Sequence, residues 1–245
     1  MNGSYFLLTN LLSEDEKRVI TGIAAHIERG EKRVGIQQIA SENFLSAASI
    51  VKMCKRLGFD GVYDMNLTAD LTIMEEAHEF LGRVKNGGKL PMITSCSPGW
   101  IKFCEHYFPE MTENLSTCKS PQQMFGATYK TYYAEKMGLD PKKILFVSAI
   151  PCTAKKFEVG RPDQSAAGVP DVDVAITTRE LARMIQKAGI DFRGLADEKF
   201  DVPFDIGSGA GAIFGATGGV MEAALRTAAE VIEGKKLEKL DFEDV

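Results

Sequence analysis

Two cysteines lie where buried strands are expected to end. Cys96 follows the apolar segment 90–94, and Cys152 follows the apolar segment 144–150. A proline beside each cysteine begins or flanks a turn into a helix, so both thiols are expected near a helix N-terminus, where the dipole and the free amides favour a thiolate. The thiolate is the form that binds soft metal ions and acts as a nucleophile. The alternative interpretation is a pair of small, buried apolar side chains.

The other three cysteines do not form a recognisable ligand set. Cys54, Cys104 and Cys118 lie within or near amphipathic segments, so we expect them in the core. No two of the five cysteines are spaced as CxxC, which excludes the four-cysteine run of a ferredoxin-type domain. The odd count and the irregular spacing also argue against a disulfide framework.

Glu76 and Glu79 are a second candidate for chemistry, in this case proton transfer. They are i and i+3 in a segment predicted to be helical, so both carboxylates lie on one face. A proton can pass between such groups through a hydroxyl or a water molecule. The alternative is an ordinary solvated acidic face, which the spacing alone leaves open.

The elements that must position these residues alternate between helices and strands. Near-continuous apolar runs are typical of parallel strands covered on both faces, and capping signals such as Thr177 with Glu180 mark the helix starts. This pattern predicts an α/β fold with parallel sheets flanked by helices. Strands are predicted over 34–40, 61–64, 90–94, 144–150 and 172–177. Helices are predicted from Ser13 to Gly30, over 47–57, 69–84, 98–108, 121–137 and 220–233, and after Thr177.

Composition sets the class of protein. The chain has 245 residues, 44% of them apolar, and a net charge of −5, so it can form a sizeable core and has no basic field for nucleic acid or an anionic membrane. No apolar stretch reaches the roughly 18 residues of a membrane span. The N-terminal residues contain no basic n-region of a signal peptide, so a cytoplasmic location is expected.

A glycine-rich run offers a competing hypothesis. Residues 207–212 satisfy GxGxxA, which can cradle a pyrophosphate at a helix N-terminus. The preceding segment 201–206 is a poor strand with Pro203 inside it, and the run lies late in the chain, so dinucleotide binding is disfavoured. The same glycine permissiveness also allows close approach to a bulky inorganic cofactor.

The chain contains three long strings in a fixed order: TSCSPGW, IPCTAKKFE and SGAGAIFGATGGVMEAALR. Together they resemble the catalytic domain of iron-only (FeFe) hydrogenases, and the likeness runs from 57 to 228 through ADLTIMEE, NLSTCKSPQQ and TTRELARMI. The resemblance implies one domain of two intertwined lobes, with 1–56 as a divergent N-terminal part and 229–245 as a charged tail. It also implies an H-cluster, a 4Fe-4S cubane joined through a cysteine to a two-iron centre, which makes or splits hydrogen.

The resemblance also implies roles for individual residues. Cys152 matches a cubane ligand, and Cys96 matches the thiol that passes a proton to the dithiolate of the two-iron centre. Lys155 matches the lysine that donates to a cyanide on the outer iron. The implied relay from Cys96 to solvent comprises Glu76, Ser116, Glu79 and Arg83. The implied lining of the cofactor pocket comprises Pro121, Gln122, Ile150, Pro151, Glu158, Phe214 and Gly215, with Ile150 in place of the usual methionine.

Two departures from the family pattern concern the cubane. The family commonly has adjacent cysteines in the first motif, and Ser97 stands at the second position as a metal-site residue. Serine is a poor ligand for a soft iron–sulfur site. The third motif, ExMACxxGCxxGGG, supplies the last two cubane cysteines in the family, and this chain reaches Val245 without it. We therefore expect the domain to be incomplete at its C-terminus, with one of four thiolates retained.

Three functions are compatible with these observations. The first is a hydrogenase catalytic chain that needs a second subunit for the third cysteine motif, with ferredoxin or another electron carrier as partner. The second is a non-catalytic relative, such as a sensor or an iron–sulfur assembly factor. The third is an unrelated nucleotide-binding α/β protein. The intact set of implied relay residues favours the first, and the lost ligands favour the second.

Overall fold

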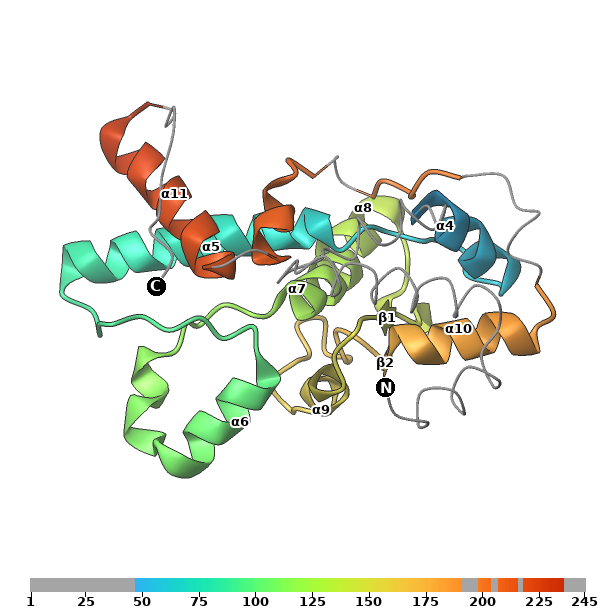
Figure 1. The fold of residues 1–245 in the computed structure, drawn as a ribbon, viewed down its shortest axis with the longest axis horizontal. Helices are drawn as coiled ribbons and strands as arrows, with labels where there is room; N and C mark the ends of the chain where they lie inside the picture. Colours follow the sequence, from blue (N-terminus) through green and yellow to red (C-terminus); the bar gives the residue numbers. More distant parts are fainter. Residues whose placement is uncertain (1–46, 191–197, 204–206, 216–217, 236–245) are drawn as a thin grey trace, which may run out of the picture. The chain divides into compact units, whose positions relative to one another are not determined.

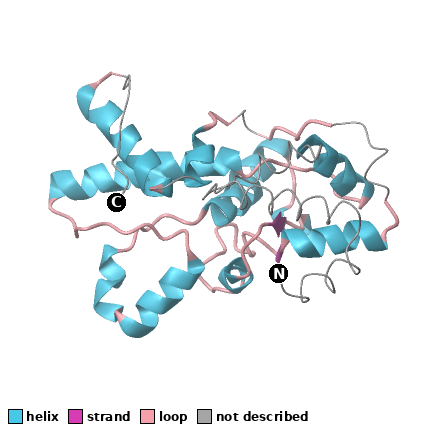
Figure 2. Cartoon of the chain, in the orientation of Figure 1, coloured by secondary structure: helices cyan, strands magenta, loops and turns pink. Residues whose placement is uncertain are grey.

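The computed structural model describes four stretches of the chain: 47–190, 198–203, 207–215 and 218–235 (Figure 1). These stretches are mostly helical and contain one short parallel sheet (Figure 2). None of the helices in them is long and apolar enough to cross a membrane. The chain divides into two compact units, the first comprising 1–62 with 189–200 and the second comprising 63–188 with 201–245. Every candidate site residue lies in the second unit.

The first unit contributes helix α4, Ala47–Arg56, which confirms the helix predicted there. Val51 is fully buried, and the chain leaves the helix through Gly58, whose φ of 99° is a conformation that glycine adopts readily. The helix predicted from Ser13 and the strand predicted over 34–40 lie outside the described residues.

Helix α5, Asn66–Asn86, carries three residues of the candidate site. The Asp64 carboxylate accepts a hydrogen bond from the Asn66 N–H at 2.9 Å and satisfies one of the free amides at the start of the helix. This contact begins the helix three residues earlier than predicted. The strand predicted over 61–64 is wrong, because this segment is irregular and forms the lead into α5.

Helix α11, Gly219–Glu233, packs along α5 and confirms the helix predicted over 220–233 (Figure 1). Small side chains form the contact, which lets the two helix backbones approach closely. The cluster consists of Ala77, Ala224 and Ala228, with Phe80 and Leu81 packed against it.

The glycine-rich run also folds against α5. Its 3-10 turn η4, Ala210–Gly215, is held by the Asp70 carboxylate, which accepts hydrogen bonds from the Ser208 N–H and, at 3.0 Å, from the Gly211 N–H. A Cβ at Gly211 would lie only 3.1 Å from the Cβ of Ala69. A carboxylate of the chain itself takes the amides that a pyrophosphate would need, which argues further against dinucleotide binding at this loop.

The strand predicted over 90–94 is also wrong. This segment forms a single parallel bridge between Ile93 and Leu115. Pro91 has no N–H to offer to a ladder, and Leu90 is exposed, so the segment lacks both the donor and the burial of an inner strand.

Helix α6, Pro98–Tyr107, begins at the predicted Ser–Pro signal. The Ser97 hydroxyl accepts a hydrogen bond from the Trp100 N–H at 3.5 Å, so Ser97 is the N-cap. The 3-10 segment η1, Pro109–Asn114, follows and leads the chain to the bridge at Leu115. The helix predicted over 98–108 is therefore confirmed to within one residue.

The helix predicted over 121–137 is confirmed, with a change of pitch inside it. Helix α7, Pro121–Thr128, passes through a π-helical turn, Tyr129–Tyr133, into helix α8, Ala134–Met137. Gly138, with a φ of 66°, ends the stretch as predicted. The core beneath it is formed by Phe125, Phe146 and Val172.

The sheet described here has two parallel strands, β1 (Val147–Ala149) and β2 (Val174–Ile176). Their parallel pairing confirms the predicted α/β class. Both strands are shorter than the apolar runs that predicted them. Before β1, the Asp173 carboxylate accepts the Phe146 N–H at 2.6 Å and takes it from the ladder. Within the described stretches, the larger sheet expected from the sequence is therefore reduced to one pair of strands.

Helices α9, Ala154–Val159, and α10, Thr178–Lys187, follow β1 and β2. The predicted capping box opens α10: the Thr177 hydroxyl accepts the Glu180 N–H at 3.2 Å, and the Glu180 carboxylate accepts the Thr177 N–H at 2.7 Å. Because β1 and β2 are parallel, the loops after them lie at the same edge of the sheet, and Cys152 lies in the loop after β1.

Candidate functional site

Glu76 is the innermost carboxyl group of the site. It lies on α5 with 1% of its surface exposed, and neither oxygen has a hydrogen-bond partner among the described residues. Burial raises the pKa of Glu76 and outweighs the opposing effects of the nearby Ser116 hydroxyl and Ser95 backbone, and the charge of Glu79 raises it further. The site therefore favours the protonated form, and the solvated acidic face left open by the spacing is excluded for Glu76.

Glu79, three residues further along α5, has the opposite surroundings. It accepts hydrogen bonds from the Ser116 hydroxyl at 2.8 Å, the Thr117 N–H at 3.0 Å and the Arg83 guanidinium at 2.5 Å. Burial raises the pKa of Glu79, but these hydrogen bonds together outweigh it and hold the pKa below its usual range. Glu79 is therefore a carboxylate at neutral pH.

Arg83 ties this carboxylate to the neighbouring backbone. Its planar guanidinium presents five donors in a rigid fork, which suits it to several acceptors at once. Besides Glu79, it donates to the backbone carbonyl groups of Lys89, Glu113, Asn114 and Leu115. These hydrogen bonds fix Arg83, and with it the Glu79 carboxylate, against the segment that leads into Ser116.

Ser116 connects the environments of the two carboxyl groups. Its buried hydroxyl donates to Glu79 and accepts the Cys118 N–H at 3.1 Å, and it lies near enough to Glu76 to affect the pKa of that group. Two carboxyl groups with pKa values pushed in opposite directions form a proton donor and a proton acceptor. The arrangement can therefore pass a proton from Glu76 through a hydroxyl to Glu79.

Cys96 lies beside Glu76, and its partly exposed thiol is 4.0 Å from the Thr94 hydroxyl. Burial raises the pKa of Cys96, and Glu76 raises it further whenever that carboxyl group is ionised, while Thr94 and Lys155 oppose the shift. The prediction of a thiolate at this helix N-terminus is therefore wrong, because burial and the neighbouring carboxyl group outweigh the dipole of α6. The thiol keeps a proton that it can donate.

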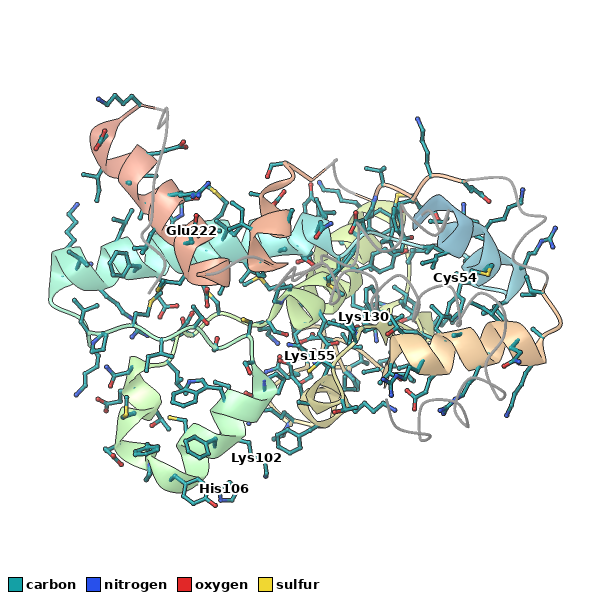
Figure 3. The ribbon with its side chains drawn as sticks, in the orientation of Figure 1. Cys54, Lys102, His106, Lys130, Lys155 and Glu222 are labelled. Atoms are coloured by element: carbon teal, nitrogen blue, oxygen red, sulfur yellow. The ribbon has the colours of Figure 1, made fainter. Side chains whose placement is uncertain are left out.

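Lys155, which is labelled in Figure 3, links the backbone of Cys96 to a buried polar cluster. Its ammonium donates to the Cys96 carbonyl at 2.7 Å and to both oxygens of Glu158, at 3.1 and 3.2 Å. Glu158 also accepts the Ser120 hydroxyl at 2.8 Å and the Gln122 amide at 2.6 Å. A buried ion pair is stable only when its remaining polar atoms are hydrogen-bonded. The contacts from Ser120 and Gln122 provide these hydrogen bonds for Glu158.

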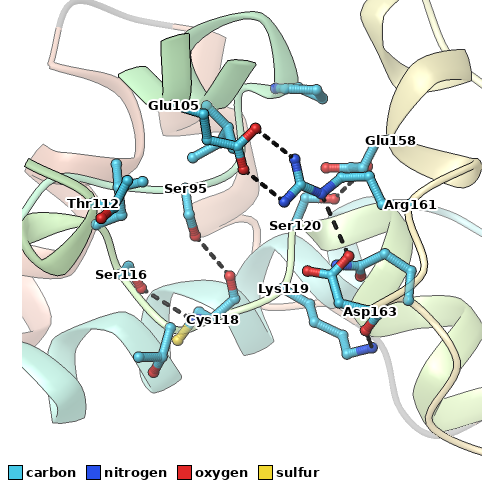
Figure 4. A pocket seen from close by; sticks show the side chains of 15 residues that line it. Ser95, Glu105, Thr112, Ser116, Cys118, Lys119, Ser120, Glu158, Arg161 and Asp163 are labelled. Carbon is cyan, nitrogen blue, oxygen red and sulfur yellow. Dashed lines mark hydrogen bonds and ion pairs between the residues drawn. The ribbon is translucent and has the colours of Figure 1, made fainter. Parts of the chain in front are cut away.

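A cavity of about 320 Å³ adjoins the relay (Figure 4). Ser95, Ser116 and Cys118 line it on the relay side. On its other side the Arg161 guanidinium makes a bidentate ion pair with Glu105, at 2.8 and 3.2 Å (Figure 4). The lining of the cavity is part polar and part apolar, and its volume is large enough for several water molecules.

The cubane does not fit the residues described here. Among them, no group of three or more His, Cys, Asp or Glu side chains is placed to hold a metal ion. Cys152 is partly exposed after β1, and the Ser97 hydroxyl is exposed and acts as the N-cap of α6. A cubane takes four thiolates, so further ligands have to come from outside the described residues.

The other residues expected to line the cofactor pocket lie on three elements. Pro121 is the first residue of α7, Phe214 and Gly215 end η4, and Ile150 and Pro151 directly follow β1. Of the expected lining residues, Gln122 and Glu158 are the pair that the structure joins by a hydrogen bond.

Four residues of the site were not predicted from the sequence: Ser95, Thr117, Cys118 and Ser120. Each donates or accepts a hydrogen bond that orients an expected site residue or the loop that carries it. They lie inside the strings TSCSPGW and NLSTCKSPQQ. Position within these motifs was the available signal, because serine and threonine alone are too common to indicate a site.

The three cysteines expected in the core differ from one another. Cys54 and Cys104 are buried, as predicted. Cys118 instead lies in a turn with a partly exposed thiol 3.6 Å from the Glu79 carboxylate. Burial and the neighbouring carboxylates raise the pKa of Cys118 to about 11, so it is a neutral thiol.

The protonated state of Glu76 predicts how stability depends on pH. A carboxyl group with a raised pKa in the folded state stabilises the fold fully below its unfolded pKa, about 4.3, and loses that contribution as the pH rises through the folded pKa. We expect Glu76→Gln to gain stability relative to the wild type as the pH rises from about 4 to about 8. Urea unfolding at both pH values measures the difference, and an unchanged difference would mean that Glu76 is not the protonated group.

Comparison with known proteins identifies the relatives of this chain. The family model for the iron only hydrogenase large subunit, C-terminal domain, matches residues 19–245. The NADP-reducing hydrogenase subunit HndD of Solidesulfovibrio fructosivorans is 56% identical over 197 residues, which are 78% of this chain and 34% of that protein. Iron hydrogenase 1 of Clostridium pasteurianum is 47% identical over 238 residues, 96% of this chain and 41% of that protein. The chain therefore spans less than half the length of these relatives.

Solved structures share the fold. The structure of HydA(deltaEFG), which reveals stepwise assembly of the [FeFe]-hydrogenase H-cluster, matches with a TM-score of 0.72 and 44% sequence identity. The match covers 82% of this chain and 50% of that one.

Proposed function

The chain belongs to the iron-only hydrogenase family, and from this premise we propose that it supplies the proton-transfer side of a site that interconverts two protons and two electrons with H2. One observation carries the proposal: the buried Glu76 has no hydrogen-bond partner among the described residues, and close to it lie Cys96 and Ser116, whose hydroxyl donates to the ionised Glu79. A buried carboxyl group without a partner costs folding free energy. Keeping one in this position is best explained by proton transfer.

The outer step of the proposed relay follows a hydrogen bond, from Ser116 to Glu79, and its inner steps rest on the proximity of Cys96, Glu76 and Ser116. Cys96 exchanges a proton with Glu76, and Glu76 exchanges one with Ser116. The Ser116 hydroxyl already donates to Glu79, which Arg83 holds as an acceptor, so a proton arriving from Glu76 displaces the hydroxyl proton outward. The same path runs inward when the outer end is protonated.

The H-cluster is the cofactor of this proposed function, and Cys152 is the ligand that this chain is proposed to contribute. We propose that the further thiolates come from the third cysteine motif, which lies outside residues 1–245. Ferredoxin or another electron-carrier protein is the proposed redox partner, and the cytoplasm is the proposed location. We propose that the electron-relay clusters lie outside residues 1–245.

Metal analysis tests this proposal. The full chain is made anaerobically with hydrogenase maturation proteins, alone and together with a polypeptide that carries the third motif. Alone, it should retain substoichiometric, labile iron, and with the added ligands it should bind iron stably and evolve H2 from a reduced electron carrier. About four irons per isolated chain that survive desalting would contradict the proposal that thiolates from outside residues 1–245 are needed. A fully loaded complex without H2 activity would contradict the hydrogenase assignment.

A non-catalytic role is the second candidate. The observation that favours it is Ser97, which stands at the second position of the first cysteine motif and is the exposed N-cap of α6, so this position offers no thiolate for the cubane. A sensor or an assembly factor of this kind would bind or transfer an iron–sulfur cluster without turning over H2. Stable cluster binding combined with absent H2 evolution and H2 oxidation would favour this role.

A further inference from the structure

The proposed relay is assembled from two chain segments, 93–96 and 115–118, that lie side by side. The Ile93 N–H donates to the Asn114 carbonyl at 2.8 Å, and the Ser116 N–H donates to the Ile93 carbonyl at 2.7 Å. Beyond this bridge, the Ser95 hydroxyl donates to the Cys118 carbonyl at 2.6 Å (Figure 4). Ser95 therefore joins the segment that carries Cys96 to the turn that carries Ser116.

That turn decides which way the Ser116 hydroxyl points. The Cys118 N–H donates to the Ser116 oxygen at 3.1 Å, and the Ser116 proton is then directed to Glu79 at 2.8 Å. The Thr117 N–H donates to the same Glu79 oxygen at 3.0 Å. The amides of Thr117 and Cys118 thus orient the Glu79 carboxylate and the Ser116 hydroxyl. The positions of these amides depend on the turn backbone, which the Ser95 hydroxyl holds.

Ser95 also borders the inner part of the relay. It precedes Cys96 in the chain, and its backbone lies close enough to Glu76 to affect that carboxyl group. Ser95 therefore lies near the inner carboxyl group and is hydrogen-bonded to the turn that orients the outer one.

We propose that Ser95 is a positioning residue for the relay: its hydroxyl holds the turn 116–118 in the conformation that directs the Ser116 hydroxyl at Glu79. This inference rests on the proposed function, because it assigns a role within the same relay. Ser95 contacts Cys118 and not the transferred proton, so its effect is on geometry. Proton transfer requires donor and acceptor within roughly 2.6–3.2 Å, so a small shift of the turn is enough to slow it.

The experiment compares Ser95→Ala with Ser95→Thr, which keeps a hydroxyl. Thr112→Ala is the matched control, because the Thr112 hydroxyl also donates to a backbone carbonyl, that of Pro109 at 2.7 Å, and lines the same cavity. In the chain alone, NMR-detected amide exchange of Thr117 and Cys118 should become roughly fivefold faster in Ser95→Ala, the factor expected for loss of one hydrogen bond. Ser95→Thr should restore slow exchange, and Thr112→Ala should leave these two amides unchanged.

The reconstituted form supplies the second readout. Ser95→Ala should lower H2 turnover and shift its pH profile, with iron content unchanged, and Ser95→Thr should recover both. Unchanged exchange of the Thr117 and Cys118 amides in Ser95→Ala would overturn the positioning role, as would an unaltered pH profile in an active enzyme. If the wild type with a full cluster is inactive, the proposed function fails, and faster exchange would still support Ser95 as the residue that holds the turn.

Discussion

Cys96→Ala and Glu79→Gln are each expected to lower H2 turnover of the reconstituted, cluster-bearing form by about 10²- to 10⁴-fold, the range for loss of a positioned proton carrier. Alanine has no proton to donate to Glu76, and the amide that replaces the carboxylate in Glu79→Gln cannot accept one from Ser116. H2 evolution from a reduced electron carrier measures the effect. Iron content should remain at the wild-type level, because neither side chain is assigned as a ligand.

Glu75→Gln is the matched control for this prediction. Glu75 lies on α5 directly before Glu76, but its side chain is exposed. Glu75→Gln should leave H2 turnover within about twofold of the wild type, because water can exchange protons at an exposed position without the help of this carboxylate. Equal losses in Glu75→Gln and Glu79→Gln would show that charge on this helix, and not the relay, controls the rate.

Cys152→Ala separates ligand from proton carrier. It should lose bound iron together with H2 activity, because it removes a proposed ligand, whereas Cys96→Ala should lose activity alone. Iron analysis after desalting measures this difference. The reverse pattern, with iron lost from Cys96→Ala and kept by Cys152→Ala, would exchange the two assignments.

Gly126→Ala is expected to destabilise the fold by about 3 kcal/mol, at the upper end of the range for overpacking a core. A Cβ at Gly126 would lie 2.1 Å from the carbonyl oxygen of Asp171, which is backbone and cannot rotate away. Asp171 is also fully buried, and its carboxylate binds the Lys119 ammonium at 2.5 Å and the Ala166 N–H at 2.8 Å. The Asp171 loop is therefore fixed by its own contacts and cannot move away from α7. Urea unfolding measures the loss of unfolding free energy in Gly126→Ala.

Gly82→Ala is the control, because its expected change in the free energy of unfolding has the opposite sign. Gly82 lies inside α5, and a Cβ there would meet nothing within 4 Å. Alanine is favoured over glycine in a helix interior by about 1 kcal/mol, so this variant should be more stable than the wild type. A Gly126→Ala chain within about 0.5 kcal/mol of the wild type would mean that the α7 contact is looser than the structure shows.

Helices could be predicted well because their signals are local. The Thr177–Glu180 capping box, the Ser97–Pro98 start and Gly138 all act within one turn of the element that they bound. Each was therefore visible in a short window of sequence, and each is found where it was predicted.

Strands were predicted less well because a strand exists only with a partner. The segment 90–94 is apolar, but it pairs through one bridge at Ile93, and the run 144–150 is shortened where the Asp173 side chain takes the Phe146 N–H. Neither the missing partner nor the competing carboxylate can be recognised from the apolar run itself.

The sequence by itself determined the family, through long ordered motifs, and the i, i+3 spacing that places Glu76 and Glu79 on one face of α5. Only the tertiary structure decided what the two carboxyl groups became. Glu76 is buried and has no hydrogen-bond partner among the described residues, whereas Glu79 accepts a hydrogen bond from Ser116, which is 37 residues away in the chain. Because a pKa depends on desolvation and on donors from distant segments, two identical side chains one turn apart acquire opposite protonation preferences that no local pattern encodes.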